Sequence, residues 1–221
     1  MSRTRRRLTD VGTGERPELL LFCGLVGLAG SLAPLVTAVW AGIVAEHDLV
    51  ADTLSDLARG PHKMIMDVGF YIHASALVCL AIAAAHAHLG RAAWSAGIFC
   101  LALLALVVSL LGLYDDFHNS WEAADSVTVH TKLSVLLGPL YLAGPLLMAP
   151  GAARAGPVYA GLFVVSAVIW IVFATLFKMA PTGYDGILEK VAIVATLLWT
   201  VPMSRLILAR GWLALARQRE G

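Results

Sequence analysis

Charged residues are scarce in this chain. Aspartate, glutamate, lysine and arginine make up 14% of its 221 residues, against about 25% in ordinary globular domains. Hydrophobic residues reach 59%, and the mean hydropathy is +0.78. A soluble core could not absorb this much apolar surface, so the composition excludes a water-soluble domain and predicts a polytopic membrane protein.

Net charge and cysteine are also low. The formal net charge is +1, so no basic field indicates a nucleic-acid partner. The three cysteines all fall inside apolar runs, and an odd number of buried thiols argues against a disulfide framework or a cysteine metal site. No internal repeat or low-complexity tract is visible, and the sequence identifies no cofactor.

What the chain has in abundance is long apolar segments. Each is close to the ~20 residues that cross a bilayer, and because lipid offers the backbone no hydrogen-bond partners, each must be a helix. The segments are Leu19–Val44, Ile65–Ala87, Ala92–Leu113, Val127–Met148, Val158–Met179 and Ile187–Leu208. We therefore predict an all-α bundle of six transmembrane helices over residues 19–209, between a basic N-terminal segment (1–18) and a basic tail (210–221).

Two kinds of residue should shape these helices. Prolines inside the apolar runs are expected to kink them; these are Pro34, Pro139, Pro145 and Pro202. Small residues in the first helix should let a neighbouring helix approach closely; these are Gly24, Gly27, Gly30 and Ser31.

Arginine predicts the orientation. With six spans, eleven of the twelve arginines fall on one side of the membrane, and Arg59, all four lysines and most of the carboxylates fall on the other. Because positively charged loops stay in the cytoplasm, both termini are expected to be cytoplasmic.

The outward side gathers titratable groups around the third and fourth helices. The stretch "YDDFHN" (114–119) ends the third helix and brings Asp115, Asp116 and His118 together. His130 falls in the first turns of the fourth helix, where its side chain should point into or just above the bundle. Ser134 and Gly138 continue its stripe at steps of four.

The loop between the first two helices should contain a short helix. In "EHDLVADTLSDLARGPHK" (46–63), Asp52 is the expected N-cap, and Ser55 and Asp56 lie in the middle of the helix. The Gly60–Pro61 pair should terminate it. We expect this helix to lie along the membrane surface or to dip into the mouth of the bundle.

The second membrane helix carries further polar side chains. Asp67, Tyr71 and Ser75 share one face of the second helix, and a carboxylate at that depth needs a partner. His73 points about 120° away from Asp67 and is expected to be a packing residue.

The last hairpin places Lys178 and Glu189 where they suit the helix dipoles. Glu189 is expected to face inward and pair with Lys178, Arg59 or a ligand, whereas Lys190 should extend outward.

The order of these motifs resembles the bacterial membrane family catalogued as domain of unknown function 998. "DTLSDLARG" precedes the second helix, a histidine opens the fourth, and "GILEK" begins the last, which also carries Trp199. More distantly, the chain is similar to six-helix Frag1/DRAM-type membrane proteins. The resemblance spans residues 19–208 and implies a bacterial cytoplasmic membrane protein. It implies no reaction.

The same resemblance implies a set of site residues. These are Ser55, Asp56, Asp115 or Asp116, His130, Gly186 and Glu189. The chain departs from the expected pattern at Lys190, where arginine is expected. It also has "YDD" where a Phe-Pro-Asp turn is common, so which of Asp115 and Asp116 matches the family's acid stays open.

Three functions fit these residues. The first is binding or remodelling of a lipid or another amphiphile at headgroup level, which the lipid-related roles of the Frag1-like proteins favour. Its expected partners are membrane lipids, with no nucleic acid, and self-association stays open. The candidate ligand-binding residues are Ser55, Asp56, Asp67, Tyr71, His130, Lys178 and Glu189.

The second function is a membrane-embedded hydrolase or transferase, with or without a metal. Its candidate catalytic residues are His130, Asp115, Asp116 and Glu189, with Glu189 as the general base. The candidate metal ligands are Asp115, Asp116, His118 and His130, although no close ligand spacing typical of metal sites is present. The third is a small proton-coupled transporter. Polar groups near one face and the absence of inverted repeats argue against it. Whether the protein is an enzyme stays open.

Overall fold

The computed structural model of the protein describes residues 14–58, 60–114, 127–181 and 183–220. Within these ranges it contains six long helices, one short helix and one 3-10 turn, and no strand. The long helices are α2 (Pro17–Val44), α4 (Lys63–Ala87), α5 (Ala92–Leu113), α6 (Val129–Ala155), α7 (Pro157–Met179) and α8 (Asp185–Glu220). All six are long and apolar enough to cross a membrane, which confirms the predicted fold class.

The helix starts follow from local chemistry. α2 and α7 begin at Pro17 and Pro157, whose fixed φ and missing N–H suit the first helical position. α4 ends before His88, which adopts a left-handed conformation with φ 44°. Every predicted start lies within two residues of the observed one.

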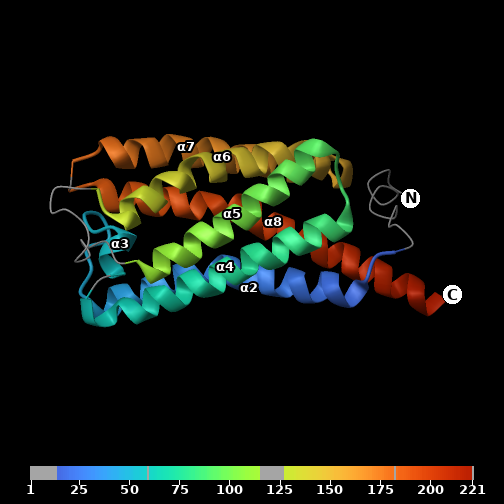
Figure 1. Ribbon diagram of the computed structural model, residues 1–221, viewed down its shortest axis with the longest axis horizontal. Coiled ribbons are helices and arrows are strands. Elements are labelled where there is room, and N and C mark those ends of the chain that lie inside the picture. The colour runs from blue at the N-terminus through green and yellow to red at the C-terminus, as the bar shows by residue number, and fades with distance from the viewer. Residues whose placement is uncertain (1–13, 59, 115–126, 182, 221) are drawn as a thin grey trace.

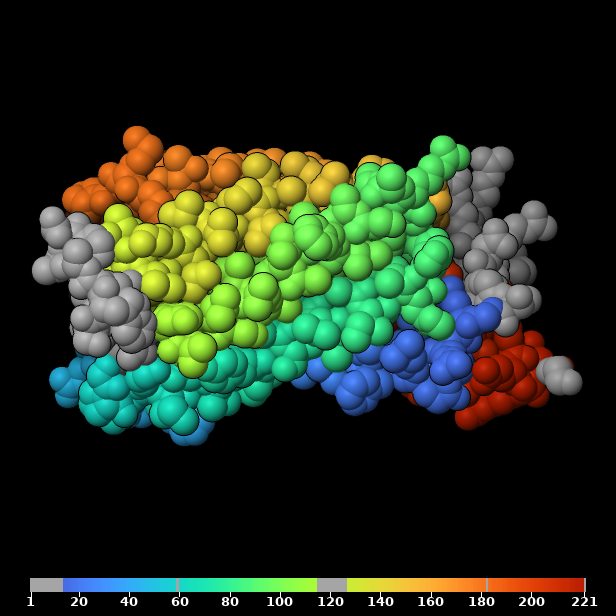
Figure 2. Space-filling model, viewed as in Figure 1, coloured from blue at the N-terminus to red at the C-terminus, as the bar shows by residue number. Residues whose placement is uncertain are grey.

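The six long helices form a closed ring. Each packs against the helix before and after it in the chain, and α8 closes the ring against α2. α5 crosses obliquely between α4 and α6, as the face in Figure 2 shows. α2 begins and α8 ends at the same end of the bundle, opposite the short helix α3 (Figure 1).

Close packing of α2 depends on its small residues. A Cβ added at Gly30 would lie 2.5 Å from the Ala76 Cβ and 2.7 Å from the Ile72 carbonyl oxygen of α4. A Cβ at Gly24 would lie 2.7 Å from the Leu208 side chain of α8. The predicted close approach of the first helix is confirmed on two sides.

The bundle is apolar inside and outside. Trp199 is fully buried, and its ring meets Tyr141 edge-on, with centroids 6.3 Å apart. On the outer surface, Trp40 is 60% exposed and Phe99 is 64% exposed. Such exposure is unfavourable in water and natural in lipid, as expected for an integral membrane protein.

Two predicted helix ends fall short of the structure. α6 continues from the expected Met148 to Ala155, and α8 continues from the expected Leu208 to Glu220. The apolar run ends before the helix does in both cases, and α6 continues even through Pro150. The four prolines expected to kink helices lie inside α2, α6 and α8, which continue through them. The kinks themselves stay a prediction.

Candidate functional site

The short helix α3 (Leu54–Leu57) lies across the end of the ring opposite the first residue of α2 (Figure 1). Thr53 caps it. The Thr53 side chain accepts a hydrogen bond from the Asp56 N–H, and Asp56 Oδ2 accepts one from the Thr53 N–H at 2.7 Å. This is a capping box. The short helix was expected and is present, but its expected cap, Asp52, is wrong.

Asp52 is instead used in the turn before α3. Its Oδ2 accepts a hydrogen bond from the Asp48 N–H at 2.8 Å and lies 3.6 Å from His47 Nδ1. Asp48 Oδ1 in turn accepts from the N–H groups of Val50 and Ala51, and these bonds lower the pKa of the Asp48 carboxyl. The loop is therefore held by its own carboxylates.

His47 is the buried titratable group of this loop. Its side chain is 3% exposed, and its Nε2 has no hydrogen-bond partner among the described residues. Burial lowers the pKa of His47, and the positive charge of Lys190 lowers it further. The carboxylates of Asp52, Asp56 and Asp48 act in the opposite direction without reversing the shift.

The first turns of α8 dock the loop. The Ile187 N–H donates to the Val50 carbonyl at 3.0 Å, and Lys190 Nζ donates to the Asp52 carbonyl at 2.6 Å. Gly186 makes this approach possible, because a Cβ there would overlap the Asp52 carbonyl oxygen. The expectation that Lys190 extends outward is therefore wrong. The loop before α3 lies so close to α8 that the Lys190 ammonium group donates to the Asp52 carbonyl instead.

Glu189 faces inward and anchors α3. Its Oε2 accepts a hydrogen bond from the Leu54 N–H at 2.5 Å, at the first residue of the short helix. Of the partners considered for it, Lys178 forms no ion pair with it within the part of the chain that the structure describes, and Arg59 lies outside that part. The partner of Glu189 is a backbone N–H, which a search for charged partners does not reveal.

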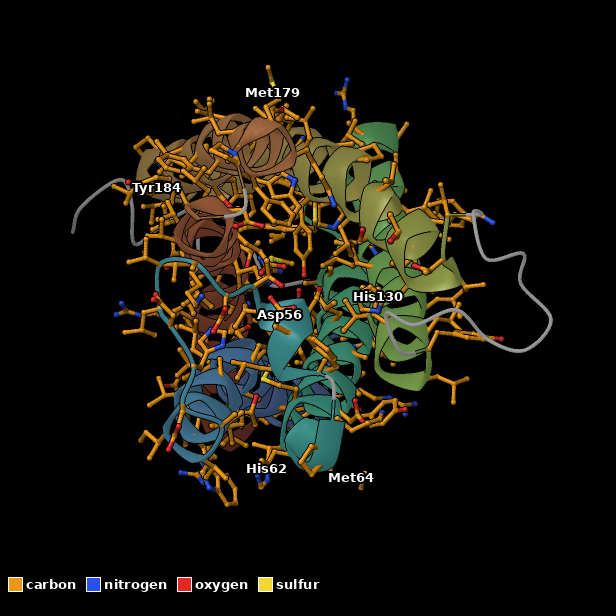
Figure 3. The ribbon with its side chains drawn as sticks, turned by 90° about the vertical axis from the view of Figure 1, so that its left-hand side faces the viewer. Asp56, His62, Met64, His130, Met179 and Tyr184 are labelled. Carbon is orange, nitrogen blue, oxygen red and sulfur yellow. The ribbon has the colours of Figure 1, made fainter. Side chains whose placement is uncertain are left out.

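His130 meets α3 from the other side. The residue is 6% exposed on the first turn of α6, where Thr128 caps the helix by accepting from the Thr131 N–H. His130 Nδ1 lies 3.0 Å from the Tyr114 carbonyl oxygen, and Nε2 lies 3.2 Å from Ser55 Oγ. Figure 3 shows Asp56 near the centre of this end of the ring, with His130 beside it on α6.

A cavity opens between α3, α6 and the α7–α8 hairpin, and we call it the mouth. Its volume is about 430 Å³. Most of its walls are polar. The lining residues are Ala51, Asp52, Thr53, Ser55, Asp56, His130, Thr131, Ser134, Phe177, Lys178 and Asp185. Asp185 Oδ1 is buried and has no hydrogen-bond partner among the described residues.

A second cavity adjoins the mouth, and we call it the groove. Its volume is about 290 Å³, and it lies between α6, α7 and α8. Apolar side chains such as Leu137, Trp170 and Ile193 dominate it. The groove and the mouth share Ser134, Phe177 and Lys178 as walls. Glu189 lines the groove side.

Other sequence candidates lie elsewhere. Asp67 is 6% exposed and pairs with Lys63 at 2.7 Å, so this carboxylate has a partner one turn away on its own helix. Tyr71 is 43% exposed. Neither residue lines the mouth or the groove. His73 is bound by the Gly30 carbonyl and the Tyr141 hydroxyl, each at 3.0 Å.

The candidate metal ligands Asp115, Asp116 and His118 lie outside the described residues. Among the residues that the structure does describe, no group of three histidine, cysteine, aspartate or glutamate residues is placed to hold a metal ion. The metal-dependent form of the hydrolase hypothesis stays a prediction.

Two features were missed from sequence. At the opposite end of the bundle, Arg210 forms a buried ion pair with Glu15, across 195 positions. At the mouth, the Tyr114 carbonyl orients His130. A backbone carbonyl leaves no mark in a sequence, but an arginine flanked on both sides by apolar residues in "LILARGWLALA" (206–216) could have indicated that Arg210 is buried.

Comparison with protein-family models identifies a family for this chain. A family described as protein of unknown function (DUF998) matches residues 28–205. This range includes the short helix, His130 and the first turns of α8. No curated protein and no solved structure matches the chain.

Proposed function

The chain belongs to the DUF998 family, a membership that assigns no reaction, and we propose from its geometry that it binds a membrane amphiphile. The polar end of the ligand occupies the mouth, and its apolar chain lies in the groove. The observation that carries this proposal is the shared wall of Ser134, Phe177 and Lys178 between a polar and an apolar cavity.

The two cavities match the two parts of a lipid. Ligand sites combine apolar walls with a few polar groups that fix orientation. Here the polar groups line the mouth, at the end of the ring. The apolar walls belong to the groove, which lies between membrane-spanning helices. With both termini in the cytoplasm, as the arginines predict, the mouth faces the headgroups of the outer leaflet.

The charges in the mouth favour a headgroup that carries both signs. Lys178 is the one lysine or arginine among the described residues that line it, and its Nζ lies 4.7 Å from the ring centroid of Phe177. Asp56 and Asp185 supply carboxylates to the same cavity. A phosphate would lie against Lys178, and an ammonium group would satisfy Asp185 Oδ1.

A groove-filling variant tests the proposal. Gly138 lines the groove, and a Cβ added there meets nothing within 4 Å, so Gly138→Leu has room for its first side-chain carbon and is expected to reduce the free volume of the groove. Gly161 on α7 is equally open and lines neither cavity, so Gly161→Leu is the matched control. The probe is phosphatidylethanolamine with a diazirine in its acyl chain, in liposomes that also contain phosphatidylglycerol.

Crosslinks from the acyl chain should map to α6, α7 and α8 at the groove and should fall several-fold in Gly138→Leu but not in Gly161→Leu. Equal crosslinking in the wild type and both variants would mean that the crosslinks come from the lipid that surrounds the protein. This result would refute the proposal. A matching experiment with diazirine-bearing phosphatidylglycerol tests the headgroup: equal labelling by both lipids would refute selection for a zwitterion.

A further inference from the structure

Ser55, His130 and the Tyr114 carbonyl form a hydrogen-bonded chain that a binding function does not require. These hydrogen bonds join α3, the start of α6 and the residue that follows α5. The distance from Ser55 Oγ to His130 Nε2 is 3.2 Å, and the distance from His130 Nδ1 to the Tyr114 carbonyl oxygen is 3.0 Å. Residues 75 positions apart are brought together for the first of these bonds.

The carbonyl fixes the tautomer of the histidine. A carbonyl oxygen can only accept a hydrogen bond, so His130 Nδ1 carries a proton. In the neutral ring, Nε2 then presents its lone pair and accepts the hydroxyl proton of Ser55. This is the arrangement of an activated nucleophile: a hydroxyl, a base within hydrogen-bond reach, and a third group that orients the base.

The serine is also accessible and well held. Ser55 and His130 both line the mouth, whereas the imidazole itself is largely buried. The capping box of Thr53 and Asp56 holds one end of α3, and Glu189 binds the N–H of the preceding residue, Leu54. A hydroxyl that served only to satisfy a buried histidine would not need an open cavity in front of it.

The position relative to the groove suggests the substrate class. His130 and Ser134 are one turn apart on α6, and Ser134 is part of the wall between the mouth and the groove. In an ester-linked lipid the carbonyl lies between headgroup and chain. A ligand with its chain in the groove therefore brings its ester group to this wall.

We propose that Ser55 is a nucleophile for acyl transfer from an ester-bearing amphiphile, with His130 as its general base and the Tyr114 carbonyl as the group that orients His130. The substrate class rests on the proposed amphiphile site; the nucleophile itself rests on the hydrogen-bonded chain. Glu189 is a positioning residue that acts through α3.

The reaction balances with water as the only co-reactant. Ser55 Oγ bonds to the ester carbonyl carbon and its proton passes to His130 Nε2. The tetrahedral intermediate collapses, the bond to the alcohol oxygen breaks, and His130 protonates the leaving alcohol. Water then attacks the acyl group on Ser55, giving its proton to His130, which returns it to Oγ as the acid leaves. Lys178 is the cation in the cavity that can stabilise the negative charge on the intermediate.

An active-site label tests the nucleophile. Full-length protein in detergent is treated with a fluorophosphonate, which phosphonylates activated serines, and the modified peptide is identified by mass spectrometry. Label is expected on Ser55, with none in Ser55→Ala and about 10²-fold slower reaction in His130→Gln. Ser75→Ala and His62→Gln are matched controls, because neither residue lines the mouth or the groove. Label on Ser134, or label that persists in Ser55→Ala, would overturn the proposal.

A cysteine variant tests the nucleophile even if the fluorophosphonate does not enter the mouth. In Ser55→Cys the new thiol should be alkylated by iodoacetamide at least about tenfold faster at pH 7 than in the double variant Ser55→Cys/His130→Gln, because His130 favours the thiolate. Equal rates, together with no fluorophosphonate label and no release of fatty acid from p-nitrophenyl esters, would refute Ser55 as a nucleophile.

The two proposals fail separately. If Gly138→Leu lowers lipid crosslinking but Ser55 is unreactive in all these assays, the nucleophile is wrong and the amphiphile site stands. If Ser55 reacts in a His130-dependent way but crosslinking is unchanged in Gly138→Leu, the nucleophile stands and the amphiphile substrate is wrong.

Discussion

The carboxylate of Glu189 accepts a hydrogen bond from the backbone N–H of Leu54 at 2.5 Å, across 135 positions of the chain. One side chain on the last helix thus fixes the first residue of the four-residue helix that carries Ser55. A helix of four residues is not stable alone. The position of α3 at the mouth therefore depends on this hydrogen bond and on the helices that α3 contacts.

Glu189→Ala should release α3 from α8. The Leu54 N–H loses its side-chain acceptor, at a cost of about 1–3 kcal/mol. Hydrogen exchange of amides 46–58 should quicken in detergent-solubilised protein, and the melting temperature should fall. Glu189→Gln retains an acceptor oxygen, so its exchange rates and melting temperature should lie between those of the wild type and Glu189→Ala. Glu220→Ala, at an exposed position near the end of α8, is the control. Unchanged exchange in Glu189→Ala would show that the remaining contacts suffice.

Gly186→Ala should prevent the loop from docking. The added Cβ would overlap the Asp52 carbonyl and lie 2.9 Å from the Val50 carbonyl oxygen, and backbone atoms cannot move aside as a side chain can. Overpacking of this kind costs about 1–3 kcal/mol. Gly183→Ala, three residues earlier, meets nothing within 4 Å and should be nearly neutral in thermal unfolding. Similar melting temperatures for the two variants would contradict the close approach seen here.

Arg210→Met should be strongly destabilising. Arg210 and Glu15 have side chains 5% and 7% exposed, so removal of the cation leaves a buried carboxylate unpaired, at about 3–5 kcal/mol. The double variant Glu15→Leu/Arg210→Met should recover most of this loss, because neither charge then remains. Unfolding of the wild type, of the single variants Arg210→Met and Glu15→Leu, and of the double variant gives the coupling free energy between the two side chains. A coupling near zero would show that the two side chains do not interact.

Acid should loosen the loop through His47. Burial holds the pKa of His47 below its ordinary value of 6.5, so folding favours the neutral ring. The stabilisation is complete above pH 6.5 and is lost as pH falls from 6.5 through the folded pKa. Exchange of amides 46–58 should therefore quicken in this window, and the His47 ring resonances should titrate below 6.5.

His47→Gln is the control for this pH dependence. Because glutamine does not titrate near neutral pH, the variant should lose the acid-dependent rise in exchange. If His47→Gln retains the whole rise, another group in the loop is responsible.

Much of the fold could be predicted because the bilayer constrains it. Apolar runs of fixed length must be helices, so the starts of all six were found within two residues. The ends of α6 and α8 were not found, since a helix can continue beyond the apolar run that identifies it in the sequence. The cap of α3 was misassigned to Asp52, although the T-L-S-D pattern at 53–56 carries the capping box.

The site was harder to predict for a physical reason. Its residues were named in part, since Ser55, His130, Lys178 and Glu189 all line the mouth or the groove. Their partners were not. Ser55 meets His130 and Glu189 meets a backbone N–H because of the ring order of the helices, and helix periodicity carries no information about which faces meet across a bundle.

The ring closes through α8, which packs against both α7 and α2 and also carries Gly186, Glu189 and Lys190. During synthesis α8 is the last of the six spans to leave the ribosome. Until it inserts, the other five helices cannot close the ring, and the loop that bears Ser55 lacks its contacts with Ile187, Glu189 and Lys190. The position of α3 at the end of the ring is thus completed only after all six spans are present, so a chain stalled before α8 would hold the short helix less firmly.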